Sequence, residues 1–236
     1  MVSLLLGGCA VPIPISKEKI ESFLRHSERT PASVTFSYLL YEPIGFNKST
    51  GAGQVWPAIL FLHGLFESGD DIGIVTRRGL PRQLELGLEI PFIVISPQTP
   101  TGTWDIKLLD ALIDHVLDRY PIDPRRLYVT GISLGGHASW ELAATYPDRF
   151  AAIAPVSTWG DVKKAVRVKD IPIWAFHGSR DPLIWPSRHK RMIEEVRTAG
   201  GHPKWTLVPG GSHDIGNQVY GNPKLYEWFL QHRVKP

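Results

Sequence analysis

Short apolar runs recur along the chain of 236 residues, and they constrain its fold more than any other feature. Most of them are continuous, which is typical of strands that are buried on both faces of a sheet. Between them lie segments whose apolar residues follow helical spacing. The predicted strands cover residues 33–41, 57–62, 91–95, 126–130, 150–154, 171–176 and 204–208, and the predicted helices cover residues 105–119, 141–146, 187–198 and 224–232.

This alternation of strands and helices predicts an α/β fold with a mainly parallel, doubly wound sheet flanked by helices. Residues 33–41 alternate only in part between apolar and polar, so they are expected at an edge of the sheet. Residues 16–29 precede this strand and are expected to form a short helix or a lead-in. The chain contains no internal repeat and no linker-like tract. Residues 16–236 are therefore predicted to form a single domain.

The composition is that of a globular protein, because 43% hydrophobic and 21% charged residues are ordinary values for a folded chain. The formal net charge is +3, but lysine and arginine are scattered among acidic residues. The short basic clusters at Arg77-Arg78, Lys163-Lys164 and residues 188–191 are expected on solvated helix faces, so no nucleic-acid partner is predicted. No metal site is expected, because a single cysteine cannot build a cysteine-rich one.

The single cysteine, Cys9, follows a short apolar run and two glycines. This arrangement resembles the lipobox at which bacterial lipoproteins are cleaved and acylated, although the run is short and no basic segment precedes it. Two interpretations of residues 1–15 stay open. In the first, they are a shortened lipoprotein-type signal, Cys9 is a lipidated membrane tether, and the protein is in the bacterial cell envelope or secreted. In the second, they are an ordinary tail on a cytoplasmic protein. No apolar stretch approaches the roughly 20 residues that cross a bilayer.

The most informative motif is Gly131-Ile132-Ser133-Leu134-Gly135, which follows a predicted strand and precedes a helix. In that context the pattern predicts a nucleophile elbow, a strained turn that presents a serine above the end of a sheet. Small residues two positions before and after the serine allow strand and helix to approach closely. We therefore predict that Ser133 is a nucleophile.

A serine nucleophile needs a base, and the base needs a group that fixes its orientation. Asp181 follows the strand at residues 171–176, and His213 follows the strand at residues 204–208. We predict that His213 is the general base and that Asp181 orients it. His177 is expected to pack or bond beneath the acid loop as a structural residue. Asp214 is not preferred as the acid, because sequence neighbours rarely point at each other.

Acyl transfer also needs donors for the oxyanion of the tetrahedral intermediate. The backbone N–H of Leu134, directly after the nucleophile, is one predicted donor. The backbone N–H of Leu65 is the other, because Gly64 lets the loop after a buried strand turn the next amide inward. His63 is expected to support this loop rather than to transfer protons.

Together these motifs resemble the esterase branch of the α/β-hydrolases, which includes proteins similar to polyhydroxybutyrate depolymerases, feruloyl esterases and phospholipase/carboxylesterases, and sequences labelled predicted peptidases. The resemblance rests on Leu62-His63-Gly64, Ser96-Pro97-Gln98, residues 128–136, Ala154-Pro155-Val156, residues 177–181 and Gly211-Ser212-His213-Asp214. It implies an α/β-hydrolase fold and a cofactor-free ester hydrolase. It also implies an acyl-enzyme intermediate carried by Ser133, Asp181 and His213.

The substrate is less closely defined by the sequence. Trp104, Trp159 and Trp185 follow predicted strands and would line an apolar or aromatic acyl pocket, or else serve as lid and packing residues. The short connection before Ile171 predicts a minimal cap or none, which favours small or polymer-attached esters with short or aromatic acyl groups. Two alternatives stay open: a serine peptidase or amidase of the same fold, and a noncatalytic binding protein.

Overall fold

The computed structural model describes residues 23–24, 36–46 and 54–235. In this part of the chain, eight strands form one sheet in the order β1-β2-β4-β3-β5-β6-β7-β8. The strands are β1 (Phe23–Leu24), β2 (Ser37–Tyr41), β3 (Trp56–Leu62), β4 (Ile93–Gln98), β5 (Ile122–Ile132), β6 (Ala152–Val156), β7 (Trp174–Gly178) and β8 (Lys204–Val208). Each predicted strand contains one of these elements or overlaps it.

Strands β3 to β8 pair in parallel, whereas β1 and β2 are antiparallel additions at one side. The predicted edge position of residues 33–41 is wrong, because β2 lies between β1 and β4. Residues 16–29 were expected to form a short helix or a lead-in. The helix is wrong at Phe23 and Leu24, which pair with Tyr41 and Leu40 as β1. The remainder of residues 16–29 lies outside the described residues, as does the predicted signal segment, residues 1–15 with Cys9.

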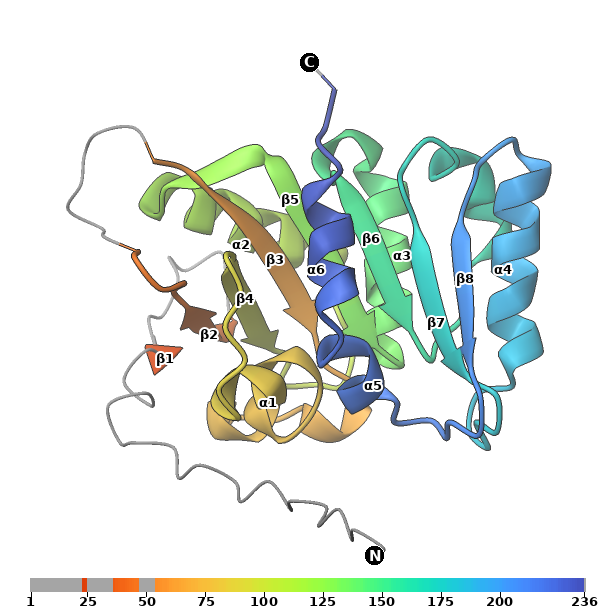
Figure 1. Cartoon of the computed structure of the whole chain (residues 1–236), viewed down its shortest axis with the longest axis horizontal. Coiled ribbons are helices and arrows are strands. Elements are labelled where there is room, and N and C mark those ends of the chain that lie inside the picture. The colour runs from red at the N-terminus through yellow and green to blue at the C-terminus, as the bar shows by residue number, and fades with distance from the viewer. Residues whose placement is uncertain (1–22, 25–35, 47–53, 236) are drawn as a thin grey trace, which may run out of the picture.

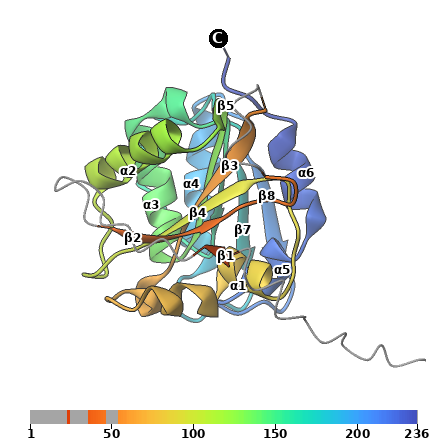
Figure 2. The ribbon, with the colours of Figure 1, turned by 90° about the vertical axis from the view of Figure 1, so that its left-hand side faces the viewer.

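Helices cover both faces of the sheet (Figures 1 and 2). One layer contains α2 (Ile106–Arg119), α3 (Leu134–Thr145) and α4 (Pro186–Thr198), and the other contains α1 (Gly79–Glu85), α5 (Gly216–Tyr220) and α6 (Pro223–Leu230). Central strand β5 contributes to both cores, since Val129 packs in one apolar cluster and Tyr128 in the other. The mainly parallel, doubly wound sheet predicted from the sequence is thus confirmed.

The helices that carry clear periodicity match the predictions closely. Asp105 caps α2 by accepting hydrogen bonds from the backbone N–H groups of Lys107 and Leu108. Helix α3 begins before residue 141, directly after Ser133. Helices α1 and α5 were not predicted, because each has only one or two turns and begins with a glycine. Four short 3-10 helices complete the described chain: η2 (Leu65–Glu67), η3 (Ile72–Arg77), η4 (Pro147–Arg149) and η5 (Val162–Arg167).

The parallel strands end at one edge of the sheet, the lower edge in Figure 1, where α1 and α5 also lie. Between β6 and β7, residues 157–173 contain only η5 as regular structure. This connection agrees with the predicted minimal cap. None of the helices in the described residues has the length and apolar character that a membrane span requires.

Candidate active site

Ser133 occupies the sharp turn between β5 and α3. Its backbone φ is 56°, in the left-handed region that a residue with a side chain rarely adopts. The turn is fixed from both sides: the Ser133 N–H donates to the Val156 carbonyl at 2.9 Å, and the Thr158 hydroxyl donates to the Ser133 carbonyl at 2.6 Å. The structure therefore has the strained strand-to-helix turn that the motif predicts.

The glycines on either side of Ser133 are required by close backbone approach. A Cβ atom on Gly131 would lie 2.5 Å from the carbonyl carbon of Gly135. A Cβ atom on Gly135 would overlap the carbonyl group of Leu62 at the end of β3 and lie 2.6 Å from the carbonyl oxygen of His63. A side chain at either position would push the strand and the helix apart.

Asp181 and His213 meet above the ends of β7 and β8. His213 Nδ1 donates a hydrogen bond of 2.8 Å to Asp181 Oδ2, and the Asp181 side chain is fully buried. The other carboxylate oxygen, Oδ1, accepts from the backbone N–H groups of Leu183 and Ile184, both at 2.9 Å. These donors hold the carboxylate in one orientation.

Ser133 and His213 line the same pocket at the carboxyl edge of the sheet. The lining residues are Phe61, His63, Gly64, Leu65, Phe66, Glu67, Arg78, Ile132, Ser133, His213 and Asp214. A serine, a histidine and a carboxylate in this order can perform nucleophilic acyl transfer. The structure brings these three predicted residues to one place, and their catalytic roles stay predictions.

Of the two predicted oxyanion donors, Leu65 lines this pocket, and Leu134 directly follows Ser133, which lines it. Leu65 is the first residue of η2, and Leu134 is the first residue of α3. An amide at the first position of a helix has no partner within its own helix and points outward. A Cβ atom on Gly64 would lie 3.7 Å from the Cβ atom of Ser133, so the two helix starts meet beside the serine.

His63 supports the loop that carries Leu65. The Thr99 N–H donates to His63 Nε2 at 3.1 Å, so the ring proton resides on Nδ1, which donates to the Gly64 carbonyl at 2.6 Å. The ring is buried, and burial lowers the pKa of His63 from 6.5 to about 4. His63 is thus a neutral support for the loop, in agreement with the prediction.

We expect His63 to make the stability of the protein depend on pH. Below pH 6.5 the unfolded chain binds a proton at His63 that the folded chain does not bind until about pH 4. The free energy of unfolding therefore falls as pH decreases through this range, with a contribution approaching about 1.4 kcal/mol per pH unit. Urea unfolding of the wild type and of His63→Gln, which keeps an acceptor for the Thr99 N–H, measures this contribution. Equal pH slopes in the two proteins would contradict it.

None of the three tryptophans predicted for the acyl pocket lines the pocket at Ser133. The Trp104 indole N–H donates to the His63 carbonyl at 3.3 Å, and its ring packs 4.8 Å from the His63 ring. Trp159 stacks on His137 at 4.8 Å. Trp185 is 71% exposed at the start of α4. Their contribution to an aromatic acyl pocket stays a prediction.

Sequence reasoning missed a charged group in the pocket. Arg78 Nε lies 3.5 Å from Glu67 Oε1 and 3.7 Å from Asp214 Oδ2. Glu67 is buried, and burial raises the pKa of its carboxyl group. The Arg77-Arg78 pair was expected on a solvated helix face. Arg78 is exposed as expected, but it lies between η3 and α1 rather than on a helix, and its side chain approaches two carboxylates of the pocket. One feature of the sequence could have indicated this charged group. Glu67 is an acidic residue four positions after His63, in a loop that follows a buried strand.

No group of three or more histidine, cysteine, aspartate or glutamate side chains within the described residues is arranged to hold a metal ion. The pocket at Ser133 contains the serine and the histidine that the sequence predicts as nucleophile and base, and such groups can perform covalent acyl transfer.

Comparison with known proteins places this site in a family. The family model named Esterase matches residues 40–215, which is more than half of the chain. The chain belongs to the esterase family. The family predicted from the sequence is thereby confirmed.

Individual relatives of this esterase are similar over parts of their length. It is 30% identical over 145 residues to a bifunctional acetylxylan esterase/xylanase of Neocallimastix patriciarum, covering 58% of this chain and 21% of that protein. It is 28% identical over 158 residues to poly(3-hydroxyalkanoate) depolymerase C of Paucimonas lemoignei, covering 52% of this chain and 38% of that protein. The crystal structure of a thermostable esterase superposes with a TM-score of 0.74 at 28% identity, over 92% of this chain and 64% of that chain. The esterase thus spans less than two thirds of each of these relatives.

Proposed function

We propose that this protein hydrolyses carboxylic esters through an acyl-enzyme intermediate on Ser133, with His213 as general base and Asp181 as the group that orients it. The observation that carries the proposal is the 2.8 Å hydrogen bond from His213 Nδ1 to buried Asp181. This bond keeps the proton on Nδ1, so Nε2 of the neutral ring is an acceptor. The ring lines the same pocket as Ser133.

The first half of the reaction forms the acyl-enzyme. His213 Nε2 takes the proton of the Ser133 hydroxyl while Oγ attacks the ester carbonyl, and the carbonyl oxygen becomes an oxyanion. The N–H groups of Leu65 and Leu134 stabilise this charge, and in comparable sites one such donor contributes about 3 kcal/mol. When the tetrahedral intermediate collapses, the C–O bond to the alcohol breaks and protonated His213 gives its proton to the leaving oxygen.

The second half returns the enzyme to its starting state. Water takes the place of the alcohol and gives a proton to His213 Nε2 as its oxygen attacks the acyl carbonyl. The new tetrahedral intermediate releases the carboxylic acid, and His213 returns the proton to Ser133. The buried charge of Asp181 stabilises the imidazolium form of His213 in both halves.

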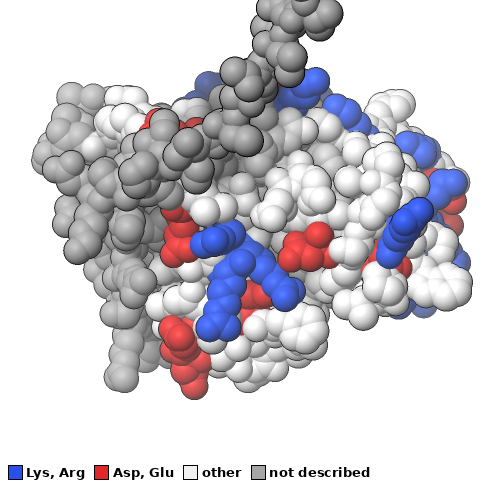
Figure 3. All heavy atoms as spheres, turned by 60° about the horizontal axis from the view of Figure 1, so that its bottom comes forward, with Lys and Arg blue, Asp and Glu red and all other residues white. Residues whose placement is uncertain are grey.

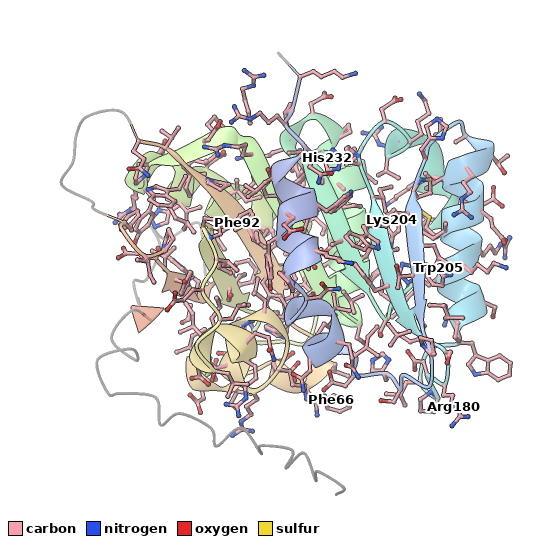
Figure 4. All side chains as sticks on the ribbon, viewed as in Figure 1. Phe66, Phe92, Arg180, Lys204, Trp205 and His232 are labelled. Carbon is pink, nitrogen blue, oxygen red and sulfur yellow. The ribbon has the colours of Figure 1, made fainter. Side chains whose placement is uncertain are left out.

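We further propose that the substrates are short acyl groups attached to a polymer. The connection between β6 and β7 is described throughout and carries no cap domain that would cover the site, which favours access for a large alcohol group. Leu65 and Phe66 in η2 line the pocket and are exposed, and Leu183 and Trp185 are exposed in the segment that follows Asp181. Figure 3 turns the carboxyl edge forward and shows uncharged surface next to groups of charged side chains, and Figure 4 shows Phe66 at this edge. Two relatives are named for acetylxylan and poly(3-hydroxyalkanoate), which agrees with such substrates.

A substrate panel tests this proposal: p-nitrophenyl acetate, butyrate and octanoate, methyl ferulate, acetylated xylo-oligosaccharides and a peptide anilide. We expect kcat/KM for the acetate to exceed that for the octanoate by about tenfold or more, because differences of a few methylenes have effects of this size. We also expect turnover of the acetylated oligosaccharides. Cleavage of the anilide without ester hydrolysis would replace the proposal with a peptidase, and no turnover together with no fluorophosphonate labelling would favour a binding protein.

A further inference from the structure

Two fully buried histidines lie close to Asp181 and form a pair with each other. His177 is on β7 and His189 is on α4, and neither is exposed to solvent. Their Nδ1 atoms are 3.1 Å apart. The ring of Trp205 on β8, labelled in Figure 4, packs 5.1 Å from the His189 ring and 6.1 Å from the His177 ring. The proposed mechanism uses neither histidine.

The hydrogen bonds at one end of this pair assign the ring protons. The indole N–H of Trp140 on α3 can only donate, and it lies 3.3 Å from His189 Nε2. His189 Nε2 is therefore an acceptor, and the proton of the neutral ring is on Nδ1. His189 Nδ1 then donates to His177 Nδ1, which leaves the proton of His177 on Nε2.

The other end of the pair gives the same assignment independently. His177 Nε2 lies 2.9 Å from the carbonyl oxygen of Ile184, which can only accept. His177 Nε2 must therefore carry the proton. Burial lowers the pKa of both histidines, which keeps both rings neutral. Every proton in the series from Trp140 to His177 is thus assigned without conflict.

The N–H group placed in this way bonds to the Ile184 carbonyl and also lies beside the carboxylate of Asp181. His177 Nε2 is 3.1 Å from Asp181 Oδ2, the same oxygen that accepts from His213. Its other contact, Ile184, belongs to the loop whose amides bind Asp181 Oδ1. In the opposite tautomer, the lone pair of His177 Nε2 would lie against the carbonyl oxygen of Ile184 and against Asp181 Oδ2. The repulsion would move the carboxylate or the loop.

We propose that His177 is a positioning residue for Asp181, and that Trp140 and His189 act through His177 by fixing its tautomer. The role rests on the proposed function, because His177 acts on the reaction only through Asp181 and His213. This role differs from the packing beneath the acid loop that the sequence predicts for His177, because it requires one particular proton position on each of the two histidine rings.

The proton positions are measurable in the wild type. Nitrogen-15 NMR of histidine-labelled protein distinguishes Nδ1–H from Nε2–H rings, and the variants His177→Gln and His189→Gln identify the signals by their loss. We expect His177 to be protonated on Nε2 and His189 on Nδ1. A His177 ring protonated on Nδ1 would overturn the proposal, and this measurement requires no catalytic activity.

Kinetics test the effect on the reaction. His177→Leu removes the N–H group, and we expect kcat to fall about tenfold or more with KM little changed, because a hydrogen bond to a charged group contributes on this scale. His177→Gln keeps an N–H donor at a similar reach and is expected to recover most of the loss. The matched control is His232→Gln, at the opposite edge of the sheet in Figure 4.

Different outcomes separate this proposal from the proposed function. If the wild type hydrolyses esters and His177→Leu matches it in kcat, the positioning role is overturned while the proposed function stands. Equal losses in His177→Leu and His177→Gln, matched by equal losses in melting temperature, would also overturn it, because the effect would then be structural. A wild type that hydrolyses no ester would overturn the proposed function itself.

Discussion

Replacing Ser133 with alanine is expected to abolish ester hydrolysis, with a fall in kcat of about a million-fold, as for other serine hydrolases that lose the nucleophile. The reason is that no other group in the proposed mechanism can form the acyl-enzyme bond. The assay compares wild type and Ser133→Ala on p-nitrophenyl acetate and follows labelling by a fluorophosphonate. We expect the variant to take no label and to unfold at a temperature close to that of the wild type, since only a hydroxyl group is removed.

The matched control is Ser187→Ala, which removes a hydroxyl from an exposed serine on α4. We expect it to keep wild-type turnover and labelling. A Ser133→Ala protein that keeps most of its activity would refute the assigned nucleophile. Loss of activity in both variants would point to a general effect on the protein rather than to the proposed chemistry.

Replacing Gly135 with alanine is expected to have the largest effect on folding among single-methyl additions at the site. The new Cβ atom would overlap the Leu62 carbonyl, and both obstacles around it, Leu62 and His63, are backbone rather than flexible side chains. Relief would require β3 and α3 to separate. We expect the free energy of unfolding to fall by about 3 kcal/mol or more, a large share of the total of about 5–15 kcal/mol for a typical protein. Urea unfolding measures the change.

Gly87→Ala is the matched control for this effect. Gly87 has a φ of +93°, and a Cβ atom there meets no other described atom within 4 Å. The same methyl group therefore costs only the conformational strain of a positive φ, about 1–2 kcal/mol. If the two variants lose equal stability, backbone crowding at the turn is not what requires Gly135.

Local patterns in the sequence determined the parallel strands of this protein and the positions of its candidate site residues. The continuous apolar runs identified the parallel strands, because a strand buried on both faces has no polar positions. The turn at Ser133 could be predicted because its requirement for small neighbours is met within five consecutive residues. Asp181 and His213 could be expected to come together because the ends of parallel strands meet at one edge of the sheet.

Contacts between distant segments were decided only by the tertiary structure. Arg78 follows no periodic pattern, and its position between Glu67 and Asp214 depends on how α1 and the loop after β3 pack. The series from Trp140 through His189 to His177 joins α3, α4 and β7, and its proton positions follow from distances that no spacing in the sequence encodes. Periodicity reports which face of an element is buried, whereas the partners that meet in the interior depend on the packing of the whole fold.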